Sequence, residues 1–305
     1  MRTSLNLQVQ NSLISIARAS DNLTAAQLHG TSGKRILKPS DDIPGTERAL
    51  SLRSAIKTVN QLADNNLVAK PALQTAEAAL NEVTKIINSV RDIAVGANNS
   101  AVMDKSAYLA QLDDISAQLL DVANTKYMDQ CIFNGTASNK PAVTAEAGEP
   151  PVYSYTGNAG VKKTQILSWV SVPTNIPGSK VFNFDGSAGA DSTDLFTMIA
   201  RVRSAVESED ATALSNELKN IDANLDNVLS CRSRVGSWMQ RMDDARSLLQ
   251  DTKSTMMGLL SDVEDIDLPS AVIELQTQEN IYQAALAINL RVMNMSLLST
   301  QLAGR

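Results

Sequence analysis

The most constraining feature of this chain is the spacing of its apolar residues by alternate steps of four and three in two outer zones, residues 1–126 and 196–305. Heptad spacing of this kind places the apolar residues along one side of a helix, where a second helix can cover them. The two zones make up about three quarters of the chain, whereas roughly one third of an ordinary globular protein is helical. The sequence therefore predicts long helices packed side by side.

Five helical segments follow from this spacing, and the first has an apolar seam that is interrupted only by Ser12. A long second helix is predicted over 46–99, and because Pro71 has no backbone N–H we expect it to kink or break near Ala69 and Lys70. The apolar positions, in chain order, are Leu5, Val9, Ile16, Ala19, Leu23 and Ala26; Leu52, Ile56, Val59, Ala63, Leu73, Leu80, Ile87 and Ala94; Tyr108, Leu112, Ile115, Leu119 and Val122; Ile221, Leu225, Val228, Val235, Met239, Met242, Leu249, Met256, Leu260 and Val263; and Val272, Leu275, Tyr282, Leu286, Met293 and Leu297.

The middle of the chain has a different character. Seven of the 14 glycines and five of the nine prolines fall within residues 127–195. Three segments there, 151–155, 164–172 and 180–184, alternate or run apolar between turn residues, as short strands do. The predicted fold class is therefore mainly α with an inserted β-rich domain at 127–195.

Charge and composition exclude several classes of function. The net charge is -6, the isoelectric point is about 5.0, and no long run of Lys or Arg occurs, which argues against nucleic acid or an anionic membrane as the main partner. The first residues contain no apolar core of a Sec signal, and we expect no membrane anchor. Cys131 and Cys231 have the spacing neither of a disulfide framework nor of a metal site, so both are predicted to be free thiols.

Catalytic patterns are scarce. His29 is the only histidine, so a histidine triad or a multi-histidine metal site would have one possible member. The run 30–35 superficially resembles a phosphate-binding loop but lacks its first Gly and its Ser or Thr. An acidic cluster before Pro269 lacks the ligand rhythm of a calcium loop, and we interpret it as a capped connection between two helices; its members are Asp262, Glu264, Asp265 and Asp267. No catalytic, cofactor-binding or metal-binding residue is predicted.

The two ends of the chain share a shortage of charge. Only two of the residues 3–28 and three of the residues 272–302 are charged, and Asn, Gln, Ser and Thr take their place. A helix face exposed to solvent normally carries Lys and Glu, so these faces are typical of surfaces that other protein covers. The alternative is that the two ends pair only with each other in a monomeric bundle.

One block of residues resembles a known family. Residues 32–36, Ser-Gly-Lys-Arg-Ile, followed by residues 38–44, Lys-Pro-Ser-Asp-Asp-Ile-Pro, are similar to the turn of bacterial flagellin and its relatives. Further segments resemble the entry to the family's inserted domain and its C-terminal half, and they are 132–135, 155–158, 234–237, 261–267 and 295–298. The resemblance extends over nearly the whole chain.

This resemblance implies a long antiparallel bundle formed by the N- and C-terminal segments, which polymerise through their ends. It divides the chain into a first assembly helix and turn at 1–45, a rod at 46–126 and 196–265 around the β-rich domain 127–195, and a last assembly helix at 266–305. Gly33 is expected to supply a positive φ, Asp41 and Asp42 to cap the next helix, and Gly236 to allow close approach of helices.

Within the family, the segment from Tyr155 to Phe182 is similar to the β domain of the hook-filament junction proteins, the third of the hook-associated proteins. Residues 133–135, Phe-Asn-Gly, are closer to filament flagellin. The junction resemblance implies as partners other copies of the chain, the hook-side hook-associated protein, flagellin, and an export chaperone at the C-terminal region. It also implies an extracellular place in the flagellum and export without a cleaved Sec signal.

Candidate assembly residues combine the terminal seams with the turn: Leu5, Val9, Ile16, Leu23, Gly33, Arg35, Asp41, Asp42, Tyr282, Leu286, Met293, Ser296 and Leu297. We expect the seams to bury their apolar stripes only on assembly. Filament flagellin is one alternative function, and an intracellular coiled-coil tether with a β insertion is another, although its flanks would usually carry charge. An enzyme is the weakest reading, because no base, nucleophile pair or cofactor loop is visible.

Overall fold

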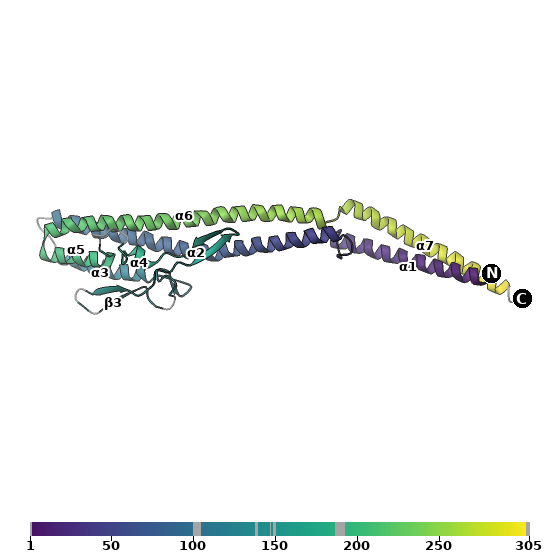
Figure 1. The fold of residues 1–305 in the computed structure, drawn as a ribbon, viewed down its shortest axis with the longest axis horizontal. Coiled ribbons are helices and arrows are strands. Elements are labelled where there is room, and N and C mark those ends of the chain that lie inside the picture. The colour runs from purple at the N-terminus through teal and green to yellow at the C-terminus, as the bar shows by residue number, and fades with distance from the viewer. Residues whose placement is uncertain are drawn as a thin grey trace. The chain divides into compact units, whose positions relative to one another are not determined.

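The structure, a computed structural model, describes residues 2–99, 105–137, 140–146, 148, 151–186 and 193–302 (Figure 1). Two compact units form, one from residues up to 58 together with residues from 253 onward, and the other from residues 59–252. The elements are α1 (Arg2–Ser32), α2 (Ile43–Asn99), α3 (Lys105–Ala123), β1 (Lys126–Tyr127), β2 (Gln130–Cys131), β3 (Val143–Glu146), β4 (Val152–Tyr155), β5 (Lys163–Leu167), β6 (Val170–Pro173), α4 (Gly178–Val181), α5 (Leu195–Ser208), α6 (Ala211–Glu264) and α7 (Leu268–Leu302). The predicted mainly α fold with strands in the middle is confirmed.

In the unit of residues 59–252, α2 and α6 lie side by side and ion pairs such as Arg232–Glu77 connect them. Their facing sides are buried at steps of three and four, which confirms the heptad spacing there; the buried residues are Leu73, Ala76, Leu80, Val83, Ile87, Val90 and Ala94 on α2, and Ile221, Asn224, Val228, Cys231, Val235 and Met242 on α6. Helices α3 and α5 pack on each other and contribute Leu112, Leu119, Met198 and Val202 to the same core.

The predicted break at Pro71 does not occur, because α2 continues through this residue from Ile43 to Asn99. A proline inside a helix costs about 3 kcal/mol, since it removes a hydrogen bond and crowds the preceding turn. Ala69 and Leu73, on either side of it, are buried in the core. Burying a single Leu side chain gains about 1.5–3 kcal/mol, so the summed packing of α2 outweighs the local cost.

The described part of the middle zone forms three separate antiparallel hairpins, β1–β2, β3–β4 and β5–β6. The predicted strand at 151–155 is confirmed as β4, and the run 164–172 folds into the two strands of the β5–β6 hairpin. The predicted strand at 180–184 is wrong, because α4 ends there and Asn183 adopts a left-handed φ of 63°. Phe182 is buried between Phe133 and Phe196, with ring centroids 5.4 and 5.9 Å away, and this packing turns the segment inward.

The strands of the middle zone share one core with the helices of their unit. Phe133, Val143, Ile166 and Val172 belong to the same buried cluster as the facing residues of α2 and α6. These buried residues of the hairpins thus belong to the core of the helices, which cover them.

Both cysteines are buried free thiols, as the spacing predicted. The expectation for Gly236 is wrong, because among the described residues no atom outside its own stretch of helix backbone lies within 4 Å of the place that a Cβ there would occupy. No close approach of helices therefore requires a glycine at this position.

Candidate assembly surface and the joint of the terminal helices

Helices α1 and α7, called the terminal pair below, lie side by side and run in opposite directions (Figure 1). The less exposed positions of each helix recur at steps of three and four, so one face of each helix meets the other. These positions are Val9, Ser12, Ile16, Ala19, Leu23 and Ala26 on α1, and Ala271, Leu275, Gln278, Tyr282, Ala285, Asn289 and Val292 on α7. The buried members are small or polar: Ala19, Ala26, Ala271 and Asn289.

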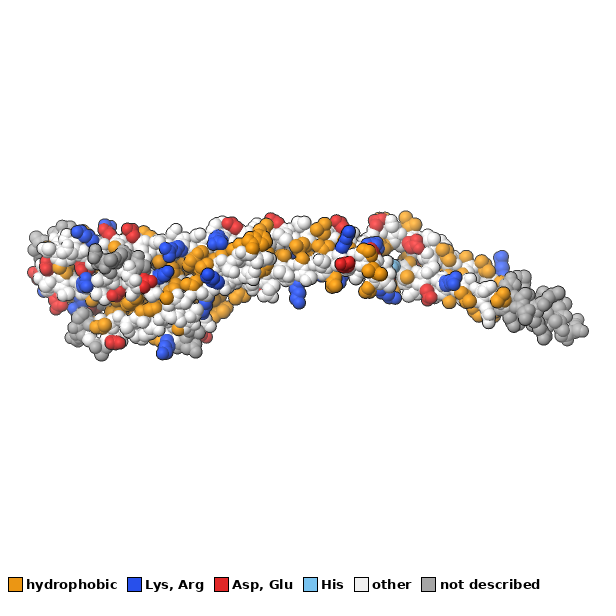
Figure 2. Space-filling model, viewed as in Figure 1, with side chains coloured by type: hydrophobic (Ala, Val, Ile, Leu, Met, Phe, Trp, Pro, Cys, Tyr) orange, Lys and Arg blue, Asp and Glu red, His pale blue; other side chains and the backbone are white. Residues whose placement is uncertain are grey.

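Large apolar side chains of the terminal pair lie on its outer surface instead. They include Leu7, Leu13, Ile14, Leu28, Val272, Ile273, Ile281, Ile288 and Leu290, each at least 46% exposed. Figure 2 shows hydrophobic side chains on one face of α1 and α7, mostly among uncharged ones. A helix pair that buries alanines and exposes leucines and isoleucines has the pattern of a surface that other protein covers.

Four of the predicted seam residues, Val9, Ile16, Leu23 and Tyr282, lie partly buried on the face between the two helices. The expectation that the seams are buried only on assembly is therefore wrong for these four, because α1 and α7 already pack on each other in the single chain. The prediction that Val272, Leu286 and Met293 continue the seam of α7 is wrong, because they are 63, 38 and 49% exposed. The contact face of α7 passes one position earlier, through Ala271, Ala285 and Val292, since alanines let the two helices approach more closely. The side chains of Leu5, Ser296 and Leu297 lie outside the described part of the structure.

The turn after α1 begins at Gly33, whose φ of +67° confirms the predicted left-handed conformation. The Gly33 amide donates to the carbonyl of His29 over 3.0 Å and ends the helix. The His29 ring places Nδ1 2.8 Å from the Lys34 carbonyl oxygen. The single histidine thus holds the turn together.

This turn is fastened to the segment between α6 and α7, and the two segments together, residues 29–46 and 261–271, are called the joint below. The Arg35 amide donates to the Glu264 carbonyl over 2.6 Å, and the Ile266 amide donates to the Gly33 carbonyl over 3.0 Å. The Arg35 guanidinium adds a hydrogen bond to the Val263 carbonyl at 2.9 Å. Of the acidic cluster, Asp265 and Asp267 form the predicted connection between α6 and α7, while Asp262 and Glu264 lie in the last turn of α6.

Glu264 is the buried charge of the joint, with a side chain only 6% exposed. Its Oε2 atom accepts from Lys34 Nζ at 3.0 Å and from Arg53 Nη2 at 2.7 Å. Burial of a carboxylate is tolerated where cations compensate it. Sequence reasoning missed Lys34 and Arg53 as partners of Glu264, because no local pattern connects residues more than 200 positions apart.

Asp41 and Asp42 have different roles in the joint, and the expectation that Asp41 caps α2 is wrong, because its carboxylate binds amides that precede it in the chain. Asp41 Oδ2 accepts from the amides of Lys38 and Leu37 at 2.8 and 3.0 Å, and these two hydrogen bonds lower the pKa of the Asp41 carboxyl. Asp42 Oδ1 accepts from the Gly45 amide at 2.9 Å, which caps α2 as predicted. This bond and the Arg35 guanidinium, 3.0 Å from Oδ2, lower the pKa of the Asp42 carboxyl.

Among the described residues, no group of His, Cys, Asp and Glu is arranged to hold a metal ion. In the same part of the chain, no helix combines the length and the apolar character that crossing a bilayer requires.

Two models of known protein families match this chain, one in its N-terminal part and one in its C-terminal part. Residues 4–138 match the family model of the bacterial flagellin N-terminal helical region, and residues 218–300 match that of the C-terminal helical region. The chain is 25% identical over 307 residues to flagellar hook-associated protein 3 of Escherichia coli (strain K12), covering 93% of this chain and 95% of that protein. It is also 25% identical over 297 residues to the flagellin of Bacillus subtilis (strain 168), covering 94 and 95%.

A solved structure, that of the flagellar junction protein from Legionella pneumophila, superposes with a TM-score of 0.60 at 15% identity and covers 71% of this chain and 99% of that one. This similarity shows a shared fold. The two family models together match well over half of the chain and contain the terminal pair and the joint. The chain therefore belongs to the bacterial flagellin family.

Proposed function

We propose that this chain is a structural subunit of the bacterial flagellum that polymerises through α1 and α7 and joins the hook to the filament. The observation that carries the proposal is the arrangement of the terminal pair, which packs small residues between its helices and exposes large apolar ones. The role is structural and needs no catalytic group. The assembly segments are residues 1–45 and 266–305, as expected from the family resemblance.

The energetics favour contacts between copies over a bundle that is complete in one chain. Covering an exposed Leu or Ile side chain gains about 1.5–3 kcal/mol. Ile14, Ile273 and Ile288 are 50, 69 and 59% exposed in the single chain. Much of the free energy of burying each side chain therefore becomes available only when a partner covers it. Charges that would have to be desolvated on association are few in this part of the sequence.

The joint supports the same role. Gly33, Arg35, Asp41 and Asp42 fix the turn between α1 and α2 through hydrogen bonds and one ion pair. A helix that must meet its neighbours in a polymer has to leave this turn in a defined direction. We therefore assign these four residues to the geometry of assembly.

Two features favour the junction over the filament. One relative of nearly equal length is named flagellar hook-associated protein 3, and one of the solved structures with this fold is named a flagellar junction protein. In this role the chain would contact the hook-side hook-associated protein at one end of its ring and flagellin at the other. Filament flagellin is the second candidate, favoured by the segment 133–135 and by the equal identity to a flagellin.

The proposal places the chain outside the cell, exported without a cleaved Sec signal. Before assembly the apolar surface of α7 requires a cover, and we assign this role to an export chaperone at the C-terminal region. The exposed Val272, Ile281 and Leu290 are part of the surface that such a chaperone would bind.

Seeded polymerisation tests the proposed function. Purified chain is mixed with hook or filament fragments and followed by light scattering and electron microscopy. Growth that stops after a short cap supports the junction role, and long filaments assign the chain to the filament. If nothing adds to either seed, the terminal pair is no assembly surface and an intracellular tether becomes the better explanation.

A further inference from the structure

A large apolar side chain stands exposed at the tip of the β5–β6 hairpin. Trp169 is 77% exposed and occupies the two-residue turn that Leu167 and Val170 close. Exposed tryptophans are uncommon, and at interfaces tryptophan is among the residues that contribute most binding energy. Trp169 is therefore the outstanding candidate for an interaction in the unit of residues 59–252.

The hairpin that carries Trp169 is held firmly against α2. The side-chain amide of Asn65 donates to the Gln165 carbonyl over 3.1 Å, and the Gln165 side chain donates to the Ser168 carbonyl over 2.8 Å. Ile166 and Val172 are buried beneath the hairpin. A side chain presented on a rigid support loses little conformational entropy on binding, which favours its use as an anchor.

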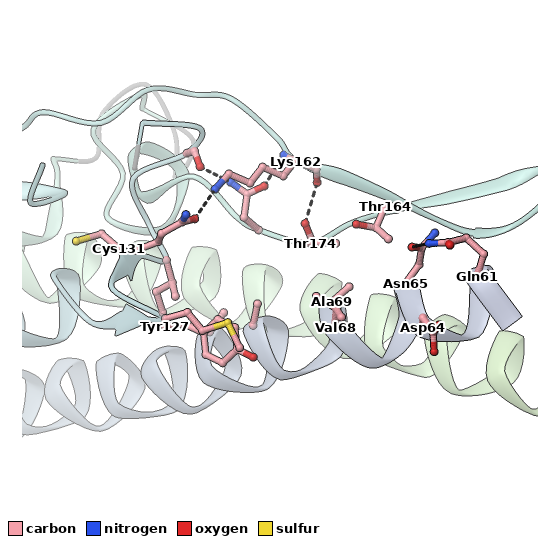
Figure 3. Close-up of a pocket in the computed structure, with 17 residues that line it drawn as sticks. Gln61, Asp64, Asn65, Val68, Ala69, Tyr127, Cys131, Lys162, Thr164 and Thr174 are labelled. Atoms are coloured by element: carbon pink, nitrogen blue, oxygen red, sulfur yellow. Dashed lines mark hydrogen bonds between the residues drawn. The ribbon is translucent and has the colours of Figure 1, made fainter. Parts of the chain in front are cut away.

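An apolar pocket of about 440 Å³ lies beside the base of the same hairpin (Figure 3). Its apolar walls come from α2 and from the β1–β2 region: Val68, Ala69, Ala72, Tyr127, Met128 and Ile132. Val68 and Met128 are 68 and 76% exposed, so much of this wall lacks a cover within the chain. Gln61 and Thr164 provide polar atoms in the lining, as an indole N–H requires.

The hairpin cannot insert its own tip into this pocket. Thr164 and Thr174 line the pocket at the base of the hairpin, while Trp169 lies five residues further along the strand. At about 3.3 Å per residue the strand separates them by roughly 16 Å. Because Asn65 of α2 holds the strand at Gln165, Trp169 can enter such a pocket only on another molecule.

We propose that Trp169 of one copy inserts into this pocket of a second copy. Residues 166–172 carry no charge, and the greater part of the exposed lining of the pocket is apolar, with Asp64 and Lys162 as its charged members. A contact between two different surfaces of identical chains is heterologous, so it repeats from copy to copy and generates a ring or a helix. The inference rests on the proposed function, since it requires that copies assemble, and it adds a contact outside the terminal pair.

The test uses the full chain in seeded polymerisation with four variants. Trp169→Ala removes the anchor and Ala72→Leu fills the pocket, and each is expected to weaken addition to the seed about tenfold or more. Val152→Ala removes another exposed apolar side chain, 62% exposed, and Ala78→Leu enlarges an exposed alanine of α2 outside the pocket. Both controls are expected to polymerise like the unaltered chain, and thermal unfolding checks that all four fold.

Fluorescence reports on the anchor directly. The chain has two tryptophans, so Trp238→Phe leaves Trp169 as the only one. On assembly, the Trp169 emission is expected to shift to shorter wavelength and to become protected from iodide quenching. Prior filling of the pocket with Ala72→Leu is expected to abolish this shift.

The outcomes separate the two proposals. If the unaltered chain adds to the seed and Trp169→Ala adds equally well, the contact is refuted while the proposed function stands. An unchanged Trp169 emission after assembly also refutes the contact. If the unaltered chain adds to no seed, the proposed function fails and the contact fails with it.

Discussion

Arg53 Nη2 donates to Glu264 Oε2 over 2.7 Å, and this ion pair connects the first part of α2 to the last residue of α6. Lys34 binds the same oxygen atom at 3.0 Å. Because both cations are about half exposed while the carboxylate is buried, we expect Glu264→Gln to weaken the joint by about 1–2 kcal/mol rather than to unfold the chain.

Hydrogen exchange of two amides measures this effect. The amides of Arg35 and Ile266 form the backbone bridge of the joint and are expected to exchange about tenfold faster in Glu264→Gln. Glu274→Gln, an exposed change on α7, serves as the matched control. Equal protection in both variants would show that the backbone bridge holds the joint without the ion pairs.

The two aspartates of the joint predict a loss of order in acid. The pKa of both Asp41 and Asp42 is lowered from the ordinary value of 3.8 in the folded chain, so their ionised forms stabilise the turn. That contribution is complete above the unfolded pKa and is lost as the pH falls through the folded pKa, that is, below about pH 3.8. The amides of Lys38 and Gly45, corrected for intrinsic exchange rates, are expected to lose protection in this range.

Replacing both aspartates by asparagine removes the two carboxyl groups that titrate. In the double variant Asp41→Asn and Asp42→Asn, protection of the turn is expected to be lower at neutral pH and to change little on acidification. A turn whose protection in the unaltered chain stays constant down to pH 2 would contradict the assignment to these carboxyls.

A charge in the terminal pair is expected to abolish assembly. Ile16 lies partly buried between α1 and α7, and an aspartate there places an unpaired carboxylate in a mainly apolar contact. Ile16→Asp should stop addition to a seed while the fluorescence of Trp238 in the other unit stays native. Val161→Asp, at an exposed position of that other unit, is the control, and filaments that grow normally from Ile16→Asp would refute the role of α1.

Two leucines of α2 form a matched pair for stability. Leu80 is fully buried and Leu67 is 63% exposed. Leu80→Ala is expected to cost about 2–5 kcal/mol, because it leaves a cavity, and Leu67→Ala less than about 0.5 kcal/mol. Urea unfolding followed by circular dichroism measures the difference, and comparable losses would mean that Leu67 is covered in solution.

Replacement by alanine is expected to change stability in opposite directions at two glycines, Gly45 and Gly236. A Cβ on Gly45 would lie 2.7 Å from Ile36 Cδ1 and closer still to the Asp42 carboxylate, so Gly45→Ala is expected to loosen the joint by about 1–3 kcal/mol. Gly236 has open space around it inside α6, and Gly236→Ala is expected to stabilise by about 0.5–1 kcal/mol. Thermal unfolding of both variants checks the signs, and a destabilised Gly236→Ala would reveal an unseen neighbour at that position.

The long helices could be predicted because their signal is local and repeated. Steps of three and four at Leu73, Leu80 and Ile87 recur over many turns, and the structure buries all three. Gly33 and Asp42 could be predicted for the same reason, since a left-handed residue and a helix cap depend on a few neighbouring atoms.

Predictions failed where a second segment of the chain decides the outcome. Packing against α6 carries α2 through Pro71, and the aromatic contacts of Phe182 replace a predicted strand with a turn. On α7 the apolar pattern fits more than one face, and only the approach of α1 selects Ala285 over Leu286.

The sequence by itself determined the helical architecture, the caps and turns, and the shortage of charge at both ends, because each depends on residues within a few positions of one another. Only the tertiary structure decided which face of α7 is covered, that Lys34 and Arg53 meet at Glu264, and that Trp169 stands exposed at the tip of a hairpin whose base lines a pocket. The physical reason is that burial and ion pairing belong to pairs of surfaces, and a surface acquires its partner only when distant segments fold together.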